Sequence, residues 1–181
     1  EVKRKLFHLS LILLPMTYLL LGKKYFLFTL LPIATLIIGI DFYRHRLPKL
    51  EIIFNKIFGQ ILRKHEIEES NWHGASFTCL SACITFGLFP KHIAVGAFII
   101  LAVSDAMATL IGRKIASQPF FEKSLVGSAT FFISSILILI SCGIIFNQRF
   151  YYYLFGFIAV FATTIVEARP SLLKLDDNLT I

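Results

Sequence analysis

The sequence predicts an all-α, polytopic membrane protein with about six transmembrane helices and one cytoplasmic amphipathic helix. Of its 181 residues, 56% are hydrophobic and only 16% are charged, whereas soluble domains average about 25% charged residues. The apolar residues gather in segments close to the length that crosses a bilayer, and the basic residues lie between those segments. This composition excludes a secreted disulfide scaffold, a disordered chain and a free cytosolic enzyme.

The apolar segments can be read in order along the chain. They fall at 6–21, 25–41, 73–89, 93–112, 126–146 and 151–166. A helix needs ~20 apolar residues to cross ~30 Å of hydrocarbon, so the first, third and sixth segments are short, which tilting, a thinned bilayer or half-burial would accommodate. No small-residue cleavage site follows the first segment, and another apolar run begins at once, so we interpret it as a span rather than a signal peptide.

The distribution of basic residues predicts the orientation. Fourteen of the 18 Lys and Arg residues lie in the N-terminus, 42–72, 113–125 and 167–181, all on one side of a six-span chain. The positive-inside rule places both termini and both long loops in the cytoplasm, in a bacterial inner membrane or an ER-type membrane. The net charge of +7 therefore reflects topology and attraction to anionic partners and membrane lipids rather than nucleic acid binding.

Two further patterns bear on the fold. Between 50 and 64, apolar residues recur at helical spacing among basic ones, which predicts an amphipathic helix on the inner membrane surface. The three cysteines, Cys79, Cys83 and Cys142, all lie inside apolar segments, so we expect small buried side chains rather than disulfides.

An acid inside the membrane is the first candidate for chemistry. Asp105 lies about seven residues before the end of the fourth segment, or roughly 10 Å below the cytoplasmic surface. A buried carboxylate needs a partner, either a cation of another helix or a bound metal. Both the structural salt bridge and the functional acid remain open at this point.

The basic loop after this segment is the second candidate. A helix N-terminus with glycine, hydroxyls and nearby cations can bind phosphate through free N–H groups. An anchor loop with an ordinary helix cap explains the same pattern equally well. The residues concerned are Arg113, Lys114, Lys123, Ser124, Gly127 and Ser128.

Other polar residues are predicted to converge on the same side. Arg4 and His8 share a helix face at the cytoplasmic end of the first span. A basic topology signal with an interfacial histidine explains these residues, and so does a role in function. Glu167 and Asp177 lie at the other end of the chain. Carboxylates close to a phosphate loop are typical of Mg²⁺ sites, although a solvated turn would explain the tail as well. Together these residues indicate a membrane enzyme acting on a phosphorylated cytosolic substrate and a lipid.

Four motifs carry a family resemblance. They are EVKRKLFH at 1–8, SDAMATLIGR at 104–113, EKSLVGS at 122–128 and EARPSLLKLDDNLTI from 167. In this order and spacing, the chain resembles the CTP-dependent lipid kinases, namely dolichol kinase, phytol kinase and the yeast-type CTP-dependent diacylglycerol kinase.

The resemblance implies a single membrane-embedded catalytic domain over 1–181 that phosphorylates a lipid alcohol with CTP and Mg²⁺. It implies that the loop binds CTP through Arg113, Lys114, Lys123, Ser124, Gly127 and Ser128, joined by Arg4. It also implies catalytic roles for Asp105, His8 and Glu167, and metal binding by Asp105, Asp177 and Glu167. The family pattern continues into another apolar segment, so we expect a last span to be missing here.

Departures from the family pattern leave alternatives open. Ser104 stands where Gly is common, Val126 where Glu is common, and Glu122 where a second Lys is common. The phosphatidate cytidylyltransferases have similar motifs and also use CTP, but their long C-terminal signature is absent from this sequence. A small transporter or a structural membrane subunit is a further alternative. The lipid alcohol, be it a polyprenol, a phytol-like alcohol or diacylglycerol, and a homodimeric state are left open.

Overall fold

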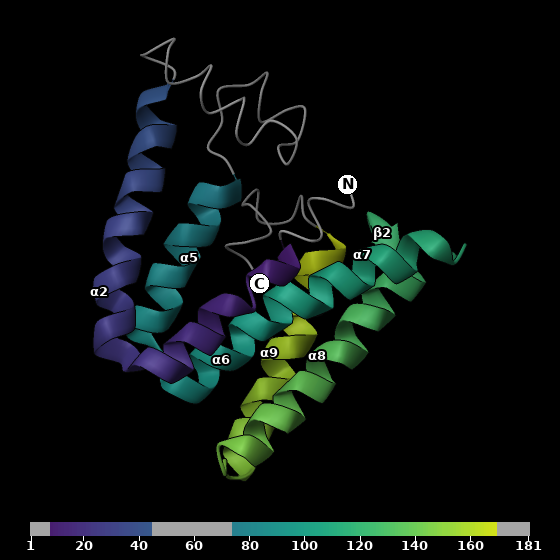
Figure 1. Ribbon diagram of the computed structural model, residues 1–181. Coiled ribbons are helices and arrows are strands. Elements are labelled where there is room, and N and C mark those ends of the chain that lie inside the picture. Colours follow the sequence, from purple (N-terminus) through teal and green to yellow (C-terminus); the bar gives the residue numbers. More distant parts are fainter. Residues whose placement is uncertain (1–7, 45–73, 170–181) are drawn as a thin grey trace.

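The computed structural model describes residues 8–44 and 74–169, which are almost entirely helical (Figure 1). The helices are α2 (Leu13–Arg44), α5 (Gly74–Leu88), α6 (Lys91–Ile99), the π-helix η1 (Ile100–Ser104), α7 (Asp105–Lys114), α8 (Leu125–Ile145) and α9 (Phe150–Ala168). Two short strands, β1 (Pro119–Phe120) and β2 (Lys123–Ser124), form an antiparallel hairpin between α7 and α8. The predicted all-α class therefore holds apart from this hairpin.

Helix α2 is divided by Gly22 into two legs. Gly22 has φ 76° and ψ 163°, a conformation that is costly for residues with a Cβ. Figure 1 shows the chain turning sharply between the purple first leg and the blue second leg. The two segments predicted at 6–21 and 25–41 thus correspond to these legs, joined by a single break instead of a loop.

An aromatic cluster holds the two legs against α5 and α6. Tyr18 precedes the break and Phe26 follows it, and their ring centroids lie 5.2 Å apart. Both rings contact Phe86 of α5, at 4.8 and 4.9 Å, and Phe86 in turn lies 4.8 Å from Phe98 of α6. Phe86 is fully buried, so this cluster is the centre of the apolar core.

Four helical stretches are long and apolar enough to cross a membrane, judged by length and composition. They are His8–Tyr43, Lys91–Lys114, Leu125–Ile145 and Phe150–Ala168. Helix α5 has 15 residues and is shorter than a usual span, so the predicted count of six spans is not confirmed. The three C-terminal segments that we predicted match α6 to α7, α8 and α9 in position.

The outer surface of the helices is apolar, as expected for a membrane protein. Leu20, Phe28, Leu88 and Phe150 are each more than 70% exposed, which water disfavours and lipid accepts. The predicted amphipathic helix at 50–64 lies outside the described residues. The three cysteines are free thiols as predicted, but only Cys142 is buried, whereas Cys79 and Cys83 are partly exposed.

Candidate active site

Asp105 lies at the first position of α7, directly after the π-helical turn η1. Single π-helical turns inside α-helices occur frequently at functional sites. Asp105 is only 6% exposed, and its Oδ2 lies 3.5 Å from Nδ1 of His8. The sequence predicted that this acid would need a partner, and in the described part of the chain His8 is one partner of Asp105.

A second buried carboxylate is paired with the loop lysine. Nζ of Lys123 on β2 forms an ion pair with Oε1 of Glu167 near the end of α9. Glu167 is 3% exposed, and Lys123 is partly buried. The backbone N–H of Glu122 donates to the carbonyl of Ala168 at 3.0 Å. The hairpin is therefore fastened to the end of α9, and two residues to which the resemblance gave separate roles lie together.

The N-terminus of α8 is capped, which is one of the two readings that the sequence left open, and its first amides have partners within the chain. Oγ of Ser124 accepts a hydrogen bond from the N–H of Gly127 at 3.1 Å. The N–H of Val126 donates to Oγ of Ser117 at 3.2 Å, and that of Leu125 donates to the carbonyl of Gln118 at 2.9 Å. The free N–H groups expected for phosphate binding are thus satisfied within the chain at these three residues.

Helices α7 and α8 touch at two glycines. A Cβ added to Gly112 would lie 2.9 Å from Cα of Gly127, and a Cβ added to Gly127 would lie 3.2 Å from the carbonyl oxygen of Ala108. Ser124 also donates its hydroxyl to the carbonyl of Gly112 at 3.2 Å. The glycine at each position therefore permits a backbone contact that brings the last turn of α7 to the capped start of α8.

The remaining predicted residues divide into exposed, buried and undescribed ones. Arg113 and Lys114 are exposed in the last turn of α7, where cations interact favourably with the helix dipole. Ser128 is 3% exposed, and its Oγ has no hydrogen-bond partner among the described residues. Arg4 and Asp177 lie outside the described residues.

No group of three His, Cys, Asp or Glu side chains within 8–44 and 74–169 is placed to hold a metal ion. Asp105 and Glu167 are nevertheless hard oxygen donors of the kind that Mg²⁺ takes, and Mg²⁺ needs only one or two protein carboxylates when it also binds phosphates. Each side chain is thus a donor of the type that magnesium takes, and a shared metal site stays a prediction.

Sequence reasoning missed two features of this polar network. Ser117 and Gln118, which bond the first amides of α8, carry no signal beyond their place in a polar loop. Asp41 of α2 is 4% exposed and accepts a hydrogen bond from Oγ of Ser76 on α5 at 2.6 Å. An acid at the end of an apolar segment was visible in the sequence, and it was a signal that could have identified Asp41.

Comparison with known proteins places the chain among relatives. An uncharacterized protein of Rickettsia prowazekii, RP860, is 34% identical over 100% of this chain and 89% of its own length. The chain belongs to the same family as this rickettsial protein. No family model and no solved structure matches the chain.

Two relatives have a described activity. CTP-dependent diacylglycerol kinase 1 of Schizosaccharomyces pombe is 28% identical over 75% of this chain, and its namesake of Saccharomyces cerevisiae is 27% identical over 76%. The aligned regions cover 64% and 48% of those kinases, so the chain spans less than two thirds of either. The similarity supports the resemblance to CTP-dependent lipid kinases at the level of a distant relationship.

Proposed function

We propose that this protein transfers the γ-phosphoryl group of CTP to the hydroxyl group of a membrane lipid alcohol. Distant similarity to two CTP-dependent diacylglycerol kinases supports this function. The structural observation that carries the proposal is the pairing of buried Asp105 with His8 at one end of an apolar helical bundle. A buried acid and an imidazole at the polar end of membrane helices can bring a lipid hydroxyl and a proton acceptor together.

In the proposed reaction, the alcohol oxygen forms a bond to the γ-phosphorus of CTP. The bond from this phosphorus to the β–γ bridging oxygen breaks, and CDP leaves with that electron pair. The alcohol proton passes to Asp105, whose carboxylate lies 3.5 Å from Nδ1 of His8. Mg²⁺, when bound by Asp105 and Glu167 together with phosphate oxygens, would neutralise negative charge on the phosphates.

Side chains, rather than the backbone amides of α8, would bind the phosphates of CTP. Three amides of its first turn already have partners within the chain. Lys123, Arg113 and Lys114 are therefore the groups to which we assign phosphate binding, with Lys123 held in place by Glu167. This assignment differs from the backbone cradle, which was one of the two readings that the sequence left open. It predicts that turnover depends strongly on the charge of Lys123.

The test is transfer of label from γ-³²P-CTP to lipid by the full chain in detergent, with Mg²⁺ and a panel of lipid alcohols. We expect labelled lipid with the wild type, loss of turnover by a factor of at least ~100 in Asp105→Asn, as for removal of a general base, and wild-type turnover in Glu122→Gln. Glu122 is an exposed acid of the hairpin and is the matched control.

Two results would overturn the proposal. Full activity of Asp105→Asn would remove the assigned site. Absence of labelled lipid alcohol, together with release of pyrophosphate from CTP and phosphatidate, would identify a cytidylyltransferase instead.

A further inference from the structure

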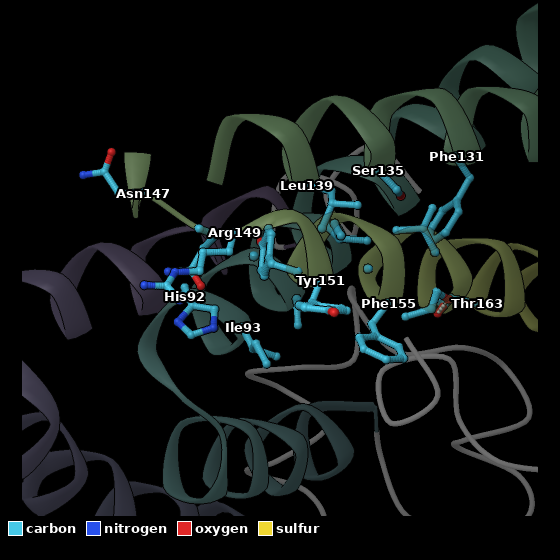
Figure 2. A pocket seen from close by; sticks show the side chains of 18 residues that line it. His92, Ile93, Phe131, Ser135, Leu139, Asn147, Arg149, Tyr151, Phe155 and Thr163 are labelled. Atoms are coloured by element: carbon cyan, nitrogen blue, oxygen red, sulfur yellow. Dashed lines mark hydrogen bonds between the residues drawn. The ribbon is translucent and has the colours of Figure 1, made fainter. Parts of the chain in front are cut away.

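A groove of about 730 Å³ lies between α6, α8 and α9 (Figure 2). Its walls are mostly apolar: Ile93 and Ile100 contribute from α6 and η1, Leu139 from α8, and Phe155 and Val160 from α9. Inside a membrane such a groove is not filled by water, because water gains no hydrogen bonds from apolar walls. An apolar molecule from the bilayer is the natural occupant.

The two ends of the groove differ in character. One end is polar, with His92, Asn147 and Arg149 near the starts of α6 and α9. Figure 2 shows these three side chains at one end and Phe131 and Thr163 at the other. The groove therefore runs along the helices instead of crossing them.

The end at Phe131 and Thr163 leads to the candidate active site. On α9, Glu167 follows Thr163 by four residues and so lies one turn further along the same face. On α8, Ser128 precedes Phe131 by three residues. On the third wall, Asp105 follows Ile100 by five residues, which is about one turn of π-helix. All three walls thus carry a polar residue of the site one turn beyond the groove.

The length of the groove fits a hydrocarbon chain. Arg149 and Thr163 both line it and are separated by about 21 Å along α9 at 1.5 Å per residue. This exceeds the roughly 15 Å of hydrocarbon in one leaflet of a ~30 Å core. A chain that starts at Glu167 and follows the groove would therefore remain covered by protein well past the middle of the bilayer.

Small residues line the middle of the groove. A Cβ added to Gly96 would be in ordinary van der Waals contact, 3.7 Å from Sγ of Cys142 and from Oη of Tyr152. Ser135 lines the groove as well, is fully buried, and its Oγ has no hydrogen-bond partner within the described ranges. A buried hydroxyl without a partner is unfavourable among packed side chains.

We infer that this groove holds the hydrocarbon tail of the lipid alcohol, with its hydroxyl group at the Asp105–His8 end. The inference rests on the proposed function and adds to it where the substrate binds and what limits its size. The groove selects substrates by tail length, because each methylene group that it covers contributes to binding. A tail shorter than the groove binds less tightly.

The test combines photolabelling with kinetics on the full chain in mixed micelles. The probe is a long-chain lipid alcohol with a diazirine in its tail, and labelled peptides are identified by mass spectrometry. Ala159 lines the groove and is exposed on α9, so Ala159→Trp would fill it. Ala162 is also exposed on α9 but is outside the groove lining, so Ala162→Trp is the matched control.

We expect the label on α8 and α9 peptides of the groove in the wild type and in Ala162→Trp. In Ala159→Trp we expect weaker labelling and a KM for long-chain alcohols raised at least about tenfold, because a blocked groove uncovers two or more methylene groups. Turnover of a short-chain alcohol should be equal in all three proteins, and this turnover tests the proposed function separately from the groove.

Several outcomes would overturn the inference. If Ala159→Trp and Ala162→Trp turn over long-chain alcohols with equal KM values, the kinase proposal stands, but the groove does not bind the tail. If phosphatidylcholine competes with the photolabel as effectively as the unlabelled alcohol does, the groove is a general lipid site. Crosslinks between two copies of the chain through α9 would make it a subunit interface. No turnover of any alcohol by the wild type would instead refute the proposed function.

Discussion

Replacing Gly112 by alanine should destabilise the protein, although alanine is the better helix former. The new Cβ would lie 2.7 Å from Oγ of Ser124 and 2.9 Å from Cα of Gly127. The second neighbour is backbone, so α7 and α8 must move apart. Such overpacking costs about 1–3 kcal/mol, while the gain in helix propensity is at most ~1 kcal/mol. The net loss is then up to about 2 kcal/mol.

The matched control is Gly39→Ala in the interior of α2. A Cβ at Gly39 would have no atom within 4 Å, so only the propensity gain of up to ~1 kcal/mol applies. For a chain of this size, each kcal/mol changes Tm by about 2–4 °C. In thermal unfolding of the purified protein in detergent, Gly112→Ala should therefore melt up to about 8 °C below the wild type, and Gly39→Ala at or above it. Equal melting of the two variants would refute the claim that the α7–α8 backbones touch.

Three further predictions concern the polar contacts. Ser124→Ala removes the cap of α8 and should cost about 1 kcal/mol, seen as a lower Tm; an unchanged Tm would show that the cap is not formed. Lys123→Met removes a cation paired with the buried carboxylate of Glu167 and should cost up to about 3–5 kcal/mol. Glu167→Gln should cost less, because the side chain of Lys123 is 30% exposed and can reach water. Denaturation of both single variants and the double variant measures this, and equal costs would contradict it. Ser76→Ala removes a hydrogen bond to the buried carboxylate of Asp41 and should cost about 1.5–3 kcal/mol, whereas a cost below 0.5 kcal/mol would mean that the bond contributes nothing.

The helices were predictable because their signal is local. Long apolar runs place α8 and α9 within a few residues, and an acidic residue inside an apolar run is enough to make Asp105 a candidate. The burial of Asp105 and Glu167 agrees with that reasoning, because carboxylates in apolar surroundings are placed where a partner can meet them. Their catalytic and metal-binding roles stay predictions.

The pairings were not predictable because they depend on tertiary structure. Lys123 and Glu167 are 44 residues apart, and no periodicity connects them. The occupied amides of α8 depend on the return of the loop at Ser117, which composition alone does not specify. Gly22 was visible as a glycine between two apolar runs, but the sequence did not show that one residue could replace a loop.

The π-helical turn before Asp105 also determines how this segment would respond to a change in length. The five residues Ile100–Ser104 make about one turn of π-helix, and four residues of α-helix turn through about the same angle, at roughly 100° each. Deleting one residue within Ile100–Ser104 would therefore convert the turn to ordinary α-helix while leaving Phe98 in the aromatic cluster and Asp105 facing His8. In an alignment of relatives, a one-residue gap at this turn is therefore compatible with the same arrangement of the buried acid.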